Sequence, residues 1–297
     1  MDRLKSCVLC SRECKVDRTK TLGFCKSTDV LKVARAELHF WEEPCISGVN
    51  GSGCVFFSGC NLQCVFCQNE KISRGEFGKE ISVERLCEIF LELEKKGAHN
   101  INLVTPTHFV LHIIKALDLA RERGLNLPIV YNTSGYEKVE TLRLLKGYVD
   151  VYLPDFKYYD ERFSSKYSSC KDYFKVVTRA IDEMFSQVGE CEFDENGLLK
   201  KGVVVRHLCL PSLTDDSKRI LKYLNRRFGE SVLISIMSQY TPMGDLKGYE
   251  ELSLPLSQDD YVDVLEYAQL IGIDYGFSQE GESAKESFIP PFDLTGV

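Results

Sequence analysis

Short apolar runs alternate with amphipathic stretches along most of this chain, a pattern that predicts parallel strands connected by helices. Six runs are typical of strands, at residues 53–57, 100–104, 127–132, 148–153, 203–208 and 231–236, and a weaker one lies at 273–275. Helical periodicity covers residues 82–96, 108–123, 137–146, 171–188, 216–228 and 257–271. We expect Ser82 and Ser257 to be N-caps, and Gly97, Gly124 and Gly147 follow predicted helix ends.

Six strand–helix units at this spacing predict an α/β fold, an incomplete parallel (β/α)6 barrel. The rival arrangement is an open doubly wound sheet, which requires a glycine-rich phosphate loop after the first strand. Here a cysteine-containing loop, residues 58–69, occupies that place. We expect three parts: a Cys-rich arm over residues 1–45, the barrel over 46–280 and a tail over 281–297. A turn at residues 194–197 indicates a small hairpin insertion before the fifth strand.

Composition narrows the class of protein. A chain of 297 residues with 44% hydrophobic residues is long enough to bury a full single core. Its net charge of −7 argues against a nucleic-acid-binding protein, which carries a basic face. No apolar run approaches the ~18 residues of a membrane span, and the first residues show no hydrophobic export core. Thirteen cysteines without an export signal indicate the reducing cytoplasm, where thiols bind metals more often than they form disulfides.

Cys60, Cys64 and Cys67 form a C-x3-C-x2-C loop directly after the first predicted strand. Such a loop offers three thiolates, whereas a cubane iron–sulfur cluster has four irons, so one iron is left open to bind a reacting molecule. A zinc knuckle is the alternative. Structural zinc sites are usually closed by four ligands from two turns, however, and no fourth ligand follows closely here. The spacing therefore favours a [4Fe–4S] cluster with one open iron.

This cysteine loop, with Phe66 just before its last cysteine, resembles the motif of the radical S-adenosylmethionine (SAM) superfamily. Segments at residues 47–60, 102–108 and 237–242 are similar to homologues of pyruvate formate-lyase activating enzyme, and the resemblance runs over roughly residues 5–280. It implies a partial barrel, SAM bound to the open iron, and one-electron cleavage of SAM to methionine and a 5′-deoxyadenosyl radical. It also implies that Phe66 contacts the adenine, that a flavodoxin or ferredoxin donates the electron, and that the cell is poor in oxygen.

Polar residues follow the predicted strands at positions that a parallel barrel brings to one mouth. The candidate cofactor-binding residues are Phe66, Thr105, Thr107, His108, Asn132, Ser134, Arg206, Gln239 and Tyr240, and the candidate catalytic residues are Asp155, Lys157 and His207. By the resemblance, the segment Thr105-Pro-Thr-His108 replaces a Gly-Gly-Glu segment that holds the SAM amino group, so hydroxyls and main-chain carbonyls take over that role. Asp155 and Lys157 match the Asp-x-Lys pattern of activating enzymes, and we expect Gln239 and Tyr240 to contact the adenine.

Two strand ends allow more than one interpretation. Asn132 stands where the activating enzyme has a cation-binding aspartate, so we expect no cation and instead contacts from Asn132 and Ser134 to ribose hydroxyls. The same residues also suit a plain turn between strand and helix. Arg206 and His207 alternate sides along one strand, and we expect His207 to face the barrel interior.

Four more cysteines, Cys7, Cys10, Cys14 and Cys25, lie in an N-terminal segment too short to hold a core of its own. Four thiolates can close a metal centre, either zinc or an iron–sulfur cluster, that folds this segment. Cys45 and Cys54 are alternative ligands. The sequence therefore predicts a second metal centre in the arm.

Two functions fit these motifs. The first is activation of a glycyl radical enzyme, in which the radical removes a hydrogen atom from a glycine of a partner protein; the resemblance favours it. The second is an epimerase, dehydrogenase or other modifying enzyme acting on a small molecule or peptide, which the cysteine-rich arm and the altered segment at 105–108 favour. A non-catalytic metal-binding protein would leave the polar strand ends without a purpose.

Overall fold

The computed structural model describes residues 2–279 and 290–297. Its strands are β1 Lys32–His39, β2 Ser52–Phe57, β3 Lys79–Glu80, β4 Ile101–Val104, β5 Ile129–Thr133, β6 Val151–Pro154, β7 Glu192–Phe193, β8 Leu199–Leu208, β9 Leu233–Met237 and β10 Gly276–Ser278. Its α-helices are α1 Asp2–Lys5, α2 Pro44–Ser47, α3 Glu70–Ser73, α4 Val83–Lys95, α5 Val110–Glu122, α6 Val139–Leu142, α7 Glu161–Ser168, α8 Tyr173–Val188, α9 Thr214–Phe228 and α10 Gln258–Leu270. Short 3₁₀ helices span Thr107–Phe109, Arg143–Leu145, Gly229–Ser231 and Glu250–Leu252.

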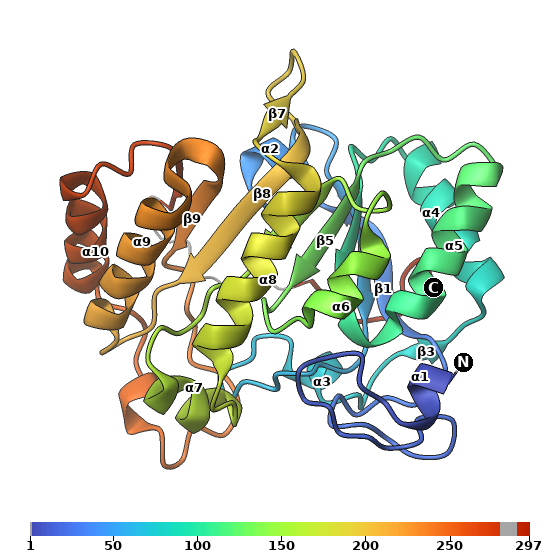
Figure 1. The fold of residues 1–297 in the computed structure, drawn as a ribbon, viewed down its shortest axis with the longest axis horizontal. Coiled ribbons are helices and arrows are strands. Elements are labelled where there is room, and N and C mark those ends of the chain that lie inside the picture. Colours follow the sequence, from blue (N-terminus) through green and yellow to red (C-terminus); the bar gives the residue numbers. More distant parts are fainter. Residues whose placement is uncertain (1, 280–289) are drawn as a thin grey trace.

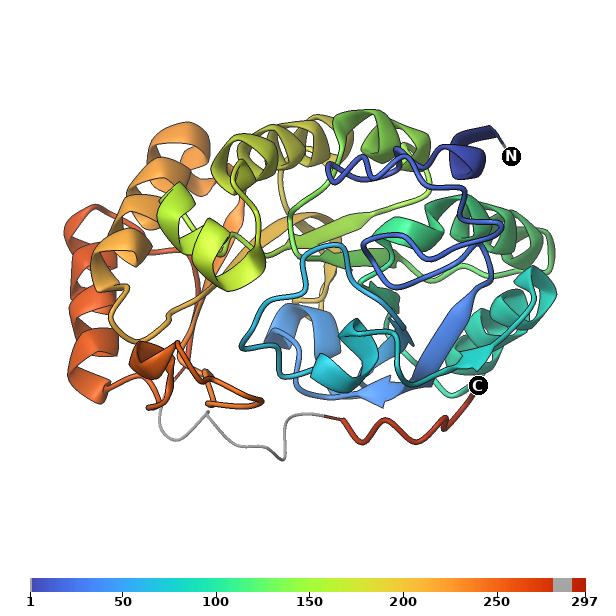
Figure 2. The ribbon, with the colours of Figure 1, turned by 90° about the horizontal axis from the view of Figure 1, so that it is seen from below.

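The strands form one curved sheet in the order β10-β9-β8-β6-β5-β4-β2-β1-β3, with β7 added to β8 as a hairpin. Every neighbouring pair from β2 to β10 is parallel. Helices α4, α5, α6, α8, α9 and α10 cover the outer face of this sheet (Figures 1 and 2). Within the described residues, β3 and β10 end the sheet without pairing to each other. The predicted incomplete parallel barrel is therefore confirmed.

Local signals in the sequence explain most helix ends. The Ser82 side chain accepts a hydrogen bond from the Arg85 amide, and Ser257 does the same for Asp260, so both expected N-caps are present. The predicted helix at 137–146 is shorter in the structure, a single turn of α6 followed by a 3₁₀ turn. Helix α7 was not predicted.

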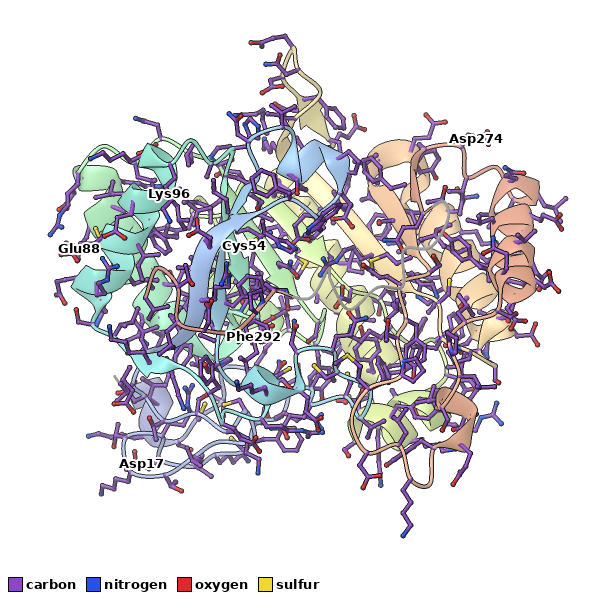
Figure 3. The ribbon with its side chains drawn as sticks, turned by 180° about the vertical axis from the view of Figure 1, so that it is seen from behind. Asp17, Cys54, Glu88, Lys96, Asp274 and Phe292 are labelled. Atoms are coloured by element: carbon purple, nitrogen blue, oxygen red, sulfur yellow. The ribbon has the colours of Figure 1, made fainter. Side chains whose placement is uncertain are left out.

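Strand β1 lies inside the segment predicted as an arm and is antiparallel to β2. The chain's last residues run along its other side, because the Leu294 amide donates to the Ala34 carbonyl and the Ala36 amide donates to the Thr295 carbonyl. Figure 3 shows Phe292 of this C-terminal segment near Cys54 of β2, and the Phe292 ring packs edge-on against Phe56 with centroids 5.6 Å apart. The predicted boundary of the tail, at residue 281, lies outside the described residues.

Helix α2 fills the barrel at the end opposite the cysteine loop. Its Cys45 and Ile46 pack against interior residues of three strands, Val130, Val151 and Val204. Cys54 faces the interior from β2, in a separate cluster that includes Phe56. Neither thiol belongs to the cluster that Cys7 and Cys14 form in the arm, so the structure does not support Cys45 or Cys54 as replacement ligands there.

Candidate active site

A cavity of about 240 Å3 opens where the carboxyl ends of the parallel strands meet. Figure 2 views the barrel from this side. The predicted residues that line the cavity are Cys60, Cys64, Phe66, Cys67, Thr105, Asn132, Ser134, Asp155, Lys157, Arg206, Gln239 and Tyr240. They come from the ends of six strands, as the topology of a parallel barrel requires.

The loop after β2 carries the three cysteines into this cavity. Burial, together with the neighbouring Cys67 and Cys64 thiols, raises the pKa of Cys60 to about 12, and burial also raises the pKa of Cys67. The Ser168 hydroxyl lies 2.9 Å from the Cys64 sulfur. Thiols in such a setting become thiolates when they bind a metal, because the metal's positive charge replaces the proton. Three thiols on one cavity wall, with Cys64 buried and Cys60 and Cys67 half-buried, therefore fit a cluster held by three cysteines.

A network of charged side chains forms the floor of the cavity. The Arg206 guanidinium donates from Nε to Asp155 Oδ1 at 3.0 Å, from Nη1 to Glu42 Oε2 at 3.0 Å, and from Nη2 to Asn132 Oδ1 at 2.6 Å. Lys157 Nζ donates to the second Asp155 oxygen at 2.7 Å. Burial alone would raise the pKa of Asp155, but Lys157 and Arg206 hold it below its ordinary value. Asp155, Lys157 and Arg206 are therefore a fixed ionised cluster.

Glu42 is the member of this network that the sequence did not reveal. It lies between β1 and α2, and its Oε1 accepts hydrogen bonds from the side-chain amides of Asn102 at 3.1 Å and Asn132 at 3.2 Å. Burial raises the pKa of Glu42, while the nearby Arg206 opposes that shift. The other site residues were predicted because they follow a parallel strand. Glu42 precedes the first of these strands, so that reasoning does not identify it. Two consecutive acidic residues before Pro44 were the only local signal.

Aromatic and amide groups form the wall beside the cysteine loop. The Phe66 ring meets Tyr240 edge-on, with centroids 6.0 Å apart, and Tyr167 at 6.4 Å. The Gln68 side-chain amide donates to the Gln239 carbonyl at 2.8 Å, which ties the cysteine loop to the end of β9. This places an apolar ring and polar main-chain groups on one wall, a combination that suits a purine.

Three of the predicted cofactor-binding and catalytic residues do not line the cavity. His207 lies on the side of β8 opposite Val204, which packs inside the barrel against α2, and opposite Arg206, which lines the cavity. Its Nδ1 contacts the Phe156 carbonyl at 2.7 Å. The expectation that His207 faces the interior is therefore wrong, and Arg206 takes that side. Thr107 and His108 turn away in a 3₁₀ helix after β4. The Thr107 hydroxyl donates to Glu137 at 2.5 Å, and His108 Nε2 contacts the Ser58 carbonyl at 2.8 Å.

Glu137 is a buried carboxyl behind the cavity, and its Oε1 accepts hydrogen bonds from the Thr107 and Thr133 hydroxyls. Burial raises its pKa to about 6 from 4.5. The folded protein therefore holds this proton more tightly than the unfolded chain, which adds about 2 kcal/mol of stability below pH 4.5 that is lost as the pH rises through 6.

We expect Glu137→Gln to remove this pH dependence of the unfolding free energy when urea unfolding is measured at pH 4.5 and 7.5. An equal change of unfolding free energy with pH in both proteins would contradict it.

The arm cysteines also gather in one place. A Cβ atom added at Gly23 would lie 3.2 Å from the Cys25 sulfur and 3.7 Å from the Cys14 sulfur. Burial raises the pKa of Cys10 to about 12, with contributions from neighbouring Cys25 and Cys7. Among residues 2–279 and 290–297, no three His, Cys, Asp or Glu side chains converge in the geometry of ligands to a single ion. In the same residues no helix is long and apolar enough to cross a membrane.

Comparison with known proteins agrees with this geometry. The family model described as the radical SAM superfamily matches residues 54–224. "Uncharacterized protein MJ0674" of Methanocaldococcus jannaschii is 31% identical over 282 residues, which cover 91% of this chain and 76% of that protein. The pyruvate formate-lyase-activating enzyme of Clostridium pasteurianum is 29% identical over 183 residues, covering 58% of this chain and 67% of the enzyme.

Two solved structures share the fold. A radical SAM methyltransferase from Sphaerobacter thermophilus matches 77% of this chain with a TM-score of 0.50 at 13% identity. Streptococcus suis SuiB bound to the precursor peptide SuiA matches 75% with a TM-score of 0.51 at 16% identity. This chain spans 65% and 46% of those chains, less than two-thirds of each, and the likeness concerns the fold alone.

Proposed function

This chain belongs to the radical SAM superfamily, and we propose that it activates a glycyl radical enzyme by abstracting a hydrogen atom from a glycine of that partner. Membership in the family implies a [4Fe–4S] cluster and SAM. The chemistry that these groups supply when bound is reductive cleavage of SAM to methionine and a 5′-deoxyadenosyl radical. Cys60, Cys64 and Cys67 are the residues that would hold the cluster.

One observation carries this proposal: the three thiols line the same cavity as the ionised cluster of Asp155, Lys157 and Arg206. Lys157 and Arg206 are the cations that would bind the SAM carboxylate, and Asp155 fixes both of them in place. Phe66, with Tyr240 behind it, offers an apolar surface for the adenine. The activating enzyme of Clostridium pasteurianum, as a relative of stated activity, supports the choice of substrate.

A second candidate function is modification of a small molecule or short peptide. It is favoured by the charged floor of the cavity, where Glu42 adds a carboxylate to Arg206 and Asp155. A glycine in a protein loop presents no charged side chain, whereas a small polar substrate can pair with these groups.

Label transfer separates the two candidates. The anaerobically reconstituted protein would be incubated with dithionite, SAM and a glycyl radical enzyme made with deuterated glycine, and 5′-deoxyadenosine would be analysed by mass spectrometry. We expect deuterium in 5′-deoxyadenosine, and none with the Cys64→Ala variant as control. Deuterium arriving only from a deuterated metabolite or peptide pool would favour the second function, and label from neither source would reject hydrogen abstraction.

We also propose a second metal centre in the arm, held by Cys7, Cys10, Cys14 and Cys25, with either zinc or an iron–sulfur cluster as its occupant. The grouping of these four thiols supports it. A protein with Cys60, Cys64 and Cys67 all replaced by alanine should still bind metal, measured as zinc, iron and sulfide per chain. The matched variant, with the four arm cysteines replaced, should lose that metal and keep the first cluster. Absence of metal from the first variant would exclude the arm site.

A further inference from the structure

The chain up to the first residue of β1, residues 2–32, is basic although the whole chain is acidic; this shorter part of the predicted arm is called the arm below. These residues hold eight Lys or Arg and four Asp or Glu, a balance of +4. The complete chain holds 37 and 44, so the remainder carries 29 basic and 40 acidic residues, a balance of −11. A local field of this sign attracts a negatively charged partner to the arm and repels it from the rest of the molecule.

Five basic side chains of the arm are exposed, whereas Lys32 is half-buried and its Nζ donates to the Gly75 carbonyl at 2.8 Å. Arg3, Lys5, Lys15, Lys20 and Lys26 are all exposed. Of these, Lys20 pairs with Asp17 at 3.7 Å, and no other member of the set forms an ion pair among the described residues. Two of the arm's acidic groups are paired with lysines, Glu13 with Lys138 and Asp17 with Lys20. The charge that an approaching partner meets on the arm is therefore positive.

The same arm touches the loop that carries Cys60, Cys64 and Cys67. The Cys60 amide donates to the Cys25 carbonyl at 3.1 Å, and Lys26 is the next residue along the arm. Gly59 allows this approach, because a Cβ there would lie 2.5 Å from the Cys25 carbonyl oxygen. Lys26 on the surface is therefore next to Cys25, and the Cys25 carbonyl is hydrogen-bonded to Cys60, one of the three cysteines that would hold the cluster.

Arg12 secures the contact from the other side of the loop. Its guanidinium donates to the Asn61 carbonyl at 2.8 Å and to the Leu62 carbonyl at 3.3 Å. It also donates to the carbonyls of Ser168 and Ser169, at 2.8 and 2.5 Å. The Gln63 side chain donates to the Phe24 carbonyl at 2.5 Å. The arm is therefore fixed against the cysteine loop on both sides.

From this juxtaposition we propose that the basic arm is the docking surface for a small acidic electron-carrier protein. The proposal rests on the proposed function, since it concerns the electron that reduces the cluster held by Cys60, Cys64 and Cys67. In each encounter the reduced carrier loses one electron and the cluster gains it. The partner is a one-electron carrier with an acidic face around its redox group, and Lys5, Lys15, Lys20 and Lys26 are the residues that attract it.

The test uses the reconstituted full chain and a purified flavodoxin in its hydroquinone form. The arm variant carries Lys5→Glu, Lys15→Glu, Lys20→Glu and Lys26→Glu. The control variant carries Lys95→Glu, Lys146→Glu, Lys175→Glu and Lys222→Glu, four exposed lysines on the outer helices or the connections between them, so both variants have the same net charge. The measurements are the dissociation constant for flavodoxin, the rate of cluster reduction by flavodoxin, and the rate of reduction by dithionite, which needs no docking surface.

We expect the arm variant to bind flavodoxin at least about tenfold more weakly and to be reduced by it at least about tenfold more slowly than the control variant. Reduction by dithionite should be equal in the two variants, and salt should slow the flavodoxin reaction of the wild type but not of the arm variant. Equal flavodoxin rates in the two variants, with normal dithionite reduction, would overturn the docking surface alone. A protein with no cluster that dithionite can reduce would overturn the proposed function as well. Loss of binding to a mixed-sequence RNA, with flavodoxin reduction unchanged, would reassign the basic surface to nucleic acid.

Discussion

Replacing Cys64 by alanine should abolish cluster reconstitution and SAM cleavage together. Cys64 lies between the other two cysteines of the loop and is only 7% exposed, so solvent offers no substitute ligand in its place. Two thiolates hold a cubane cluster poorly. Loss of an outer-shell partner already costs about 10–100-fold in metal affinity, and we expect the loss of a direct ligand to exceed that range. The measurements are iron and sulfide per chain and the yield of 5′-deoxyadenosine with dithionite and SAM.

Cys209→Ala is the matched control for this change. Cys209 is also buried, 1% exposed, but it does not line the cavity. The substitution removes a small apolar side chain there, so iron content and 5′-deoxyadenosine yield should stay near wild type. Normal 5′-deoxyadenosine production by Cys64→Ala would reject the assignment of the cysteine loop as a cluster site.

The part of the site that follows the parallel strands was predictable, because chain order and topology fix it. Cys60, Asp155 and Lys157 each come shortly after a strand whose apolar run is visible in the sequence, and parallel strands bring their carboxyl ends to one mouth. Local side-chain direction was less predictable. Arg206 and His207 are neighbours on one strand, and which of them faces inward depends on the register of β8 in the sheet, where Arg206 pairs with Ser235 and His207 with Ile236 of β9.

The parts that were missed depend on contacts between residues far apart in the chain. Glu42 enters the cavity only because β1 runs antiparallel to β2 and the chain then turns back into the barrel. The hydrogen bond between Cys25 and Cys60 joins the arm to the cysteine loop, and nothing in the sequence indicates that these two segments are in contact. Thr107 and His108 were predicted to line the site because they follow a parallel strand. A 3₁₀ turn after β4 instead directs their side chains to Glu137 and Ser58. Periodicity carries no information about such turns and long-range contacts.

Replacing Arg206 by leucine should lower the free energy of unfolding by about 3–5 kcal/mol. The guanidinium is the shared partner of Asp155 and Glu42, and leucine leaves the Glu42 carboxylate in the barrel without a cation. Asp155 keeps Lys157 at 2.7 Å, so most of the loss falls on Glu42. Urea unfolding of the wild type and the variant at neutral pH measures the difference.

Two further variants separate this buried network from a simple loss of charge. Arg219 lies 3.5 Å from Asp160 on the surface, with half of its side chain exposed, and Arg219→Leu should cost less than about 1 kcal/mol. Adding Glu42→Gln to Arg206→Leu removes the uncompensated charge while keeping an acceptor oxygen for Asn102 and Asn132. The double variant should therefore be more stable than Arg206→Leu alone. If it is less stable, the carboxylate of Glu42 is already neutral or solvated in the folded protein, and the ion pair with Arg206 is not what stabilises the floor of the cavity.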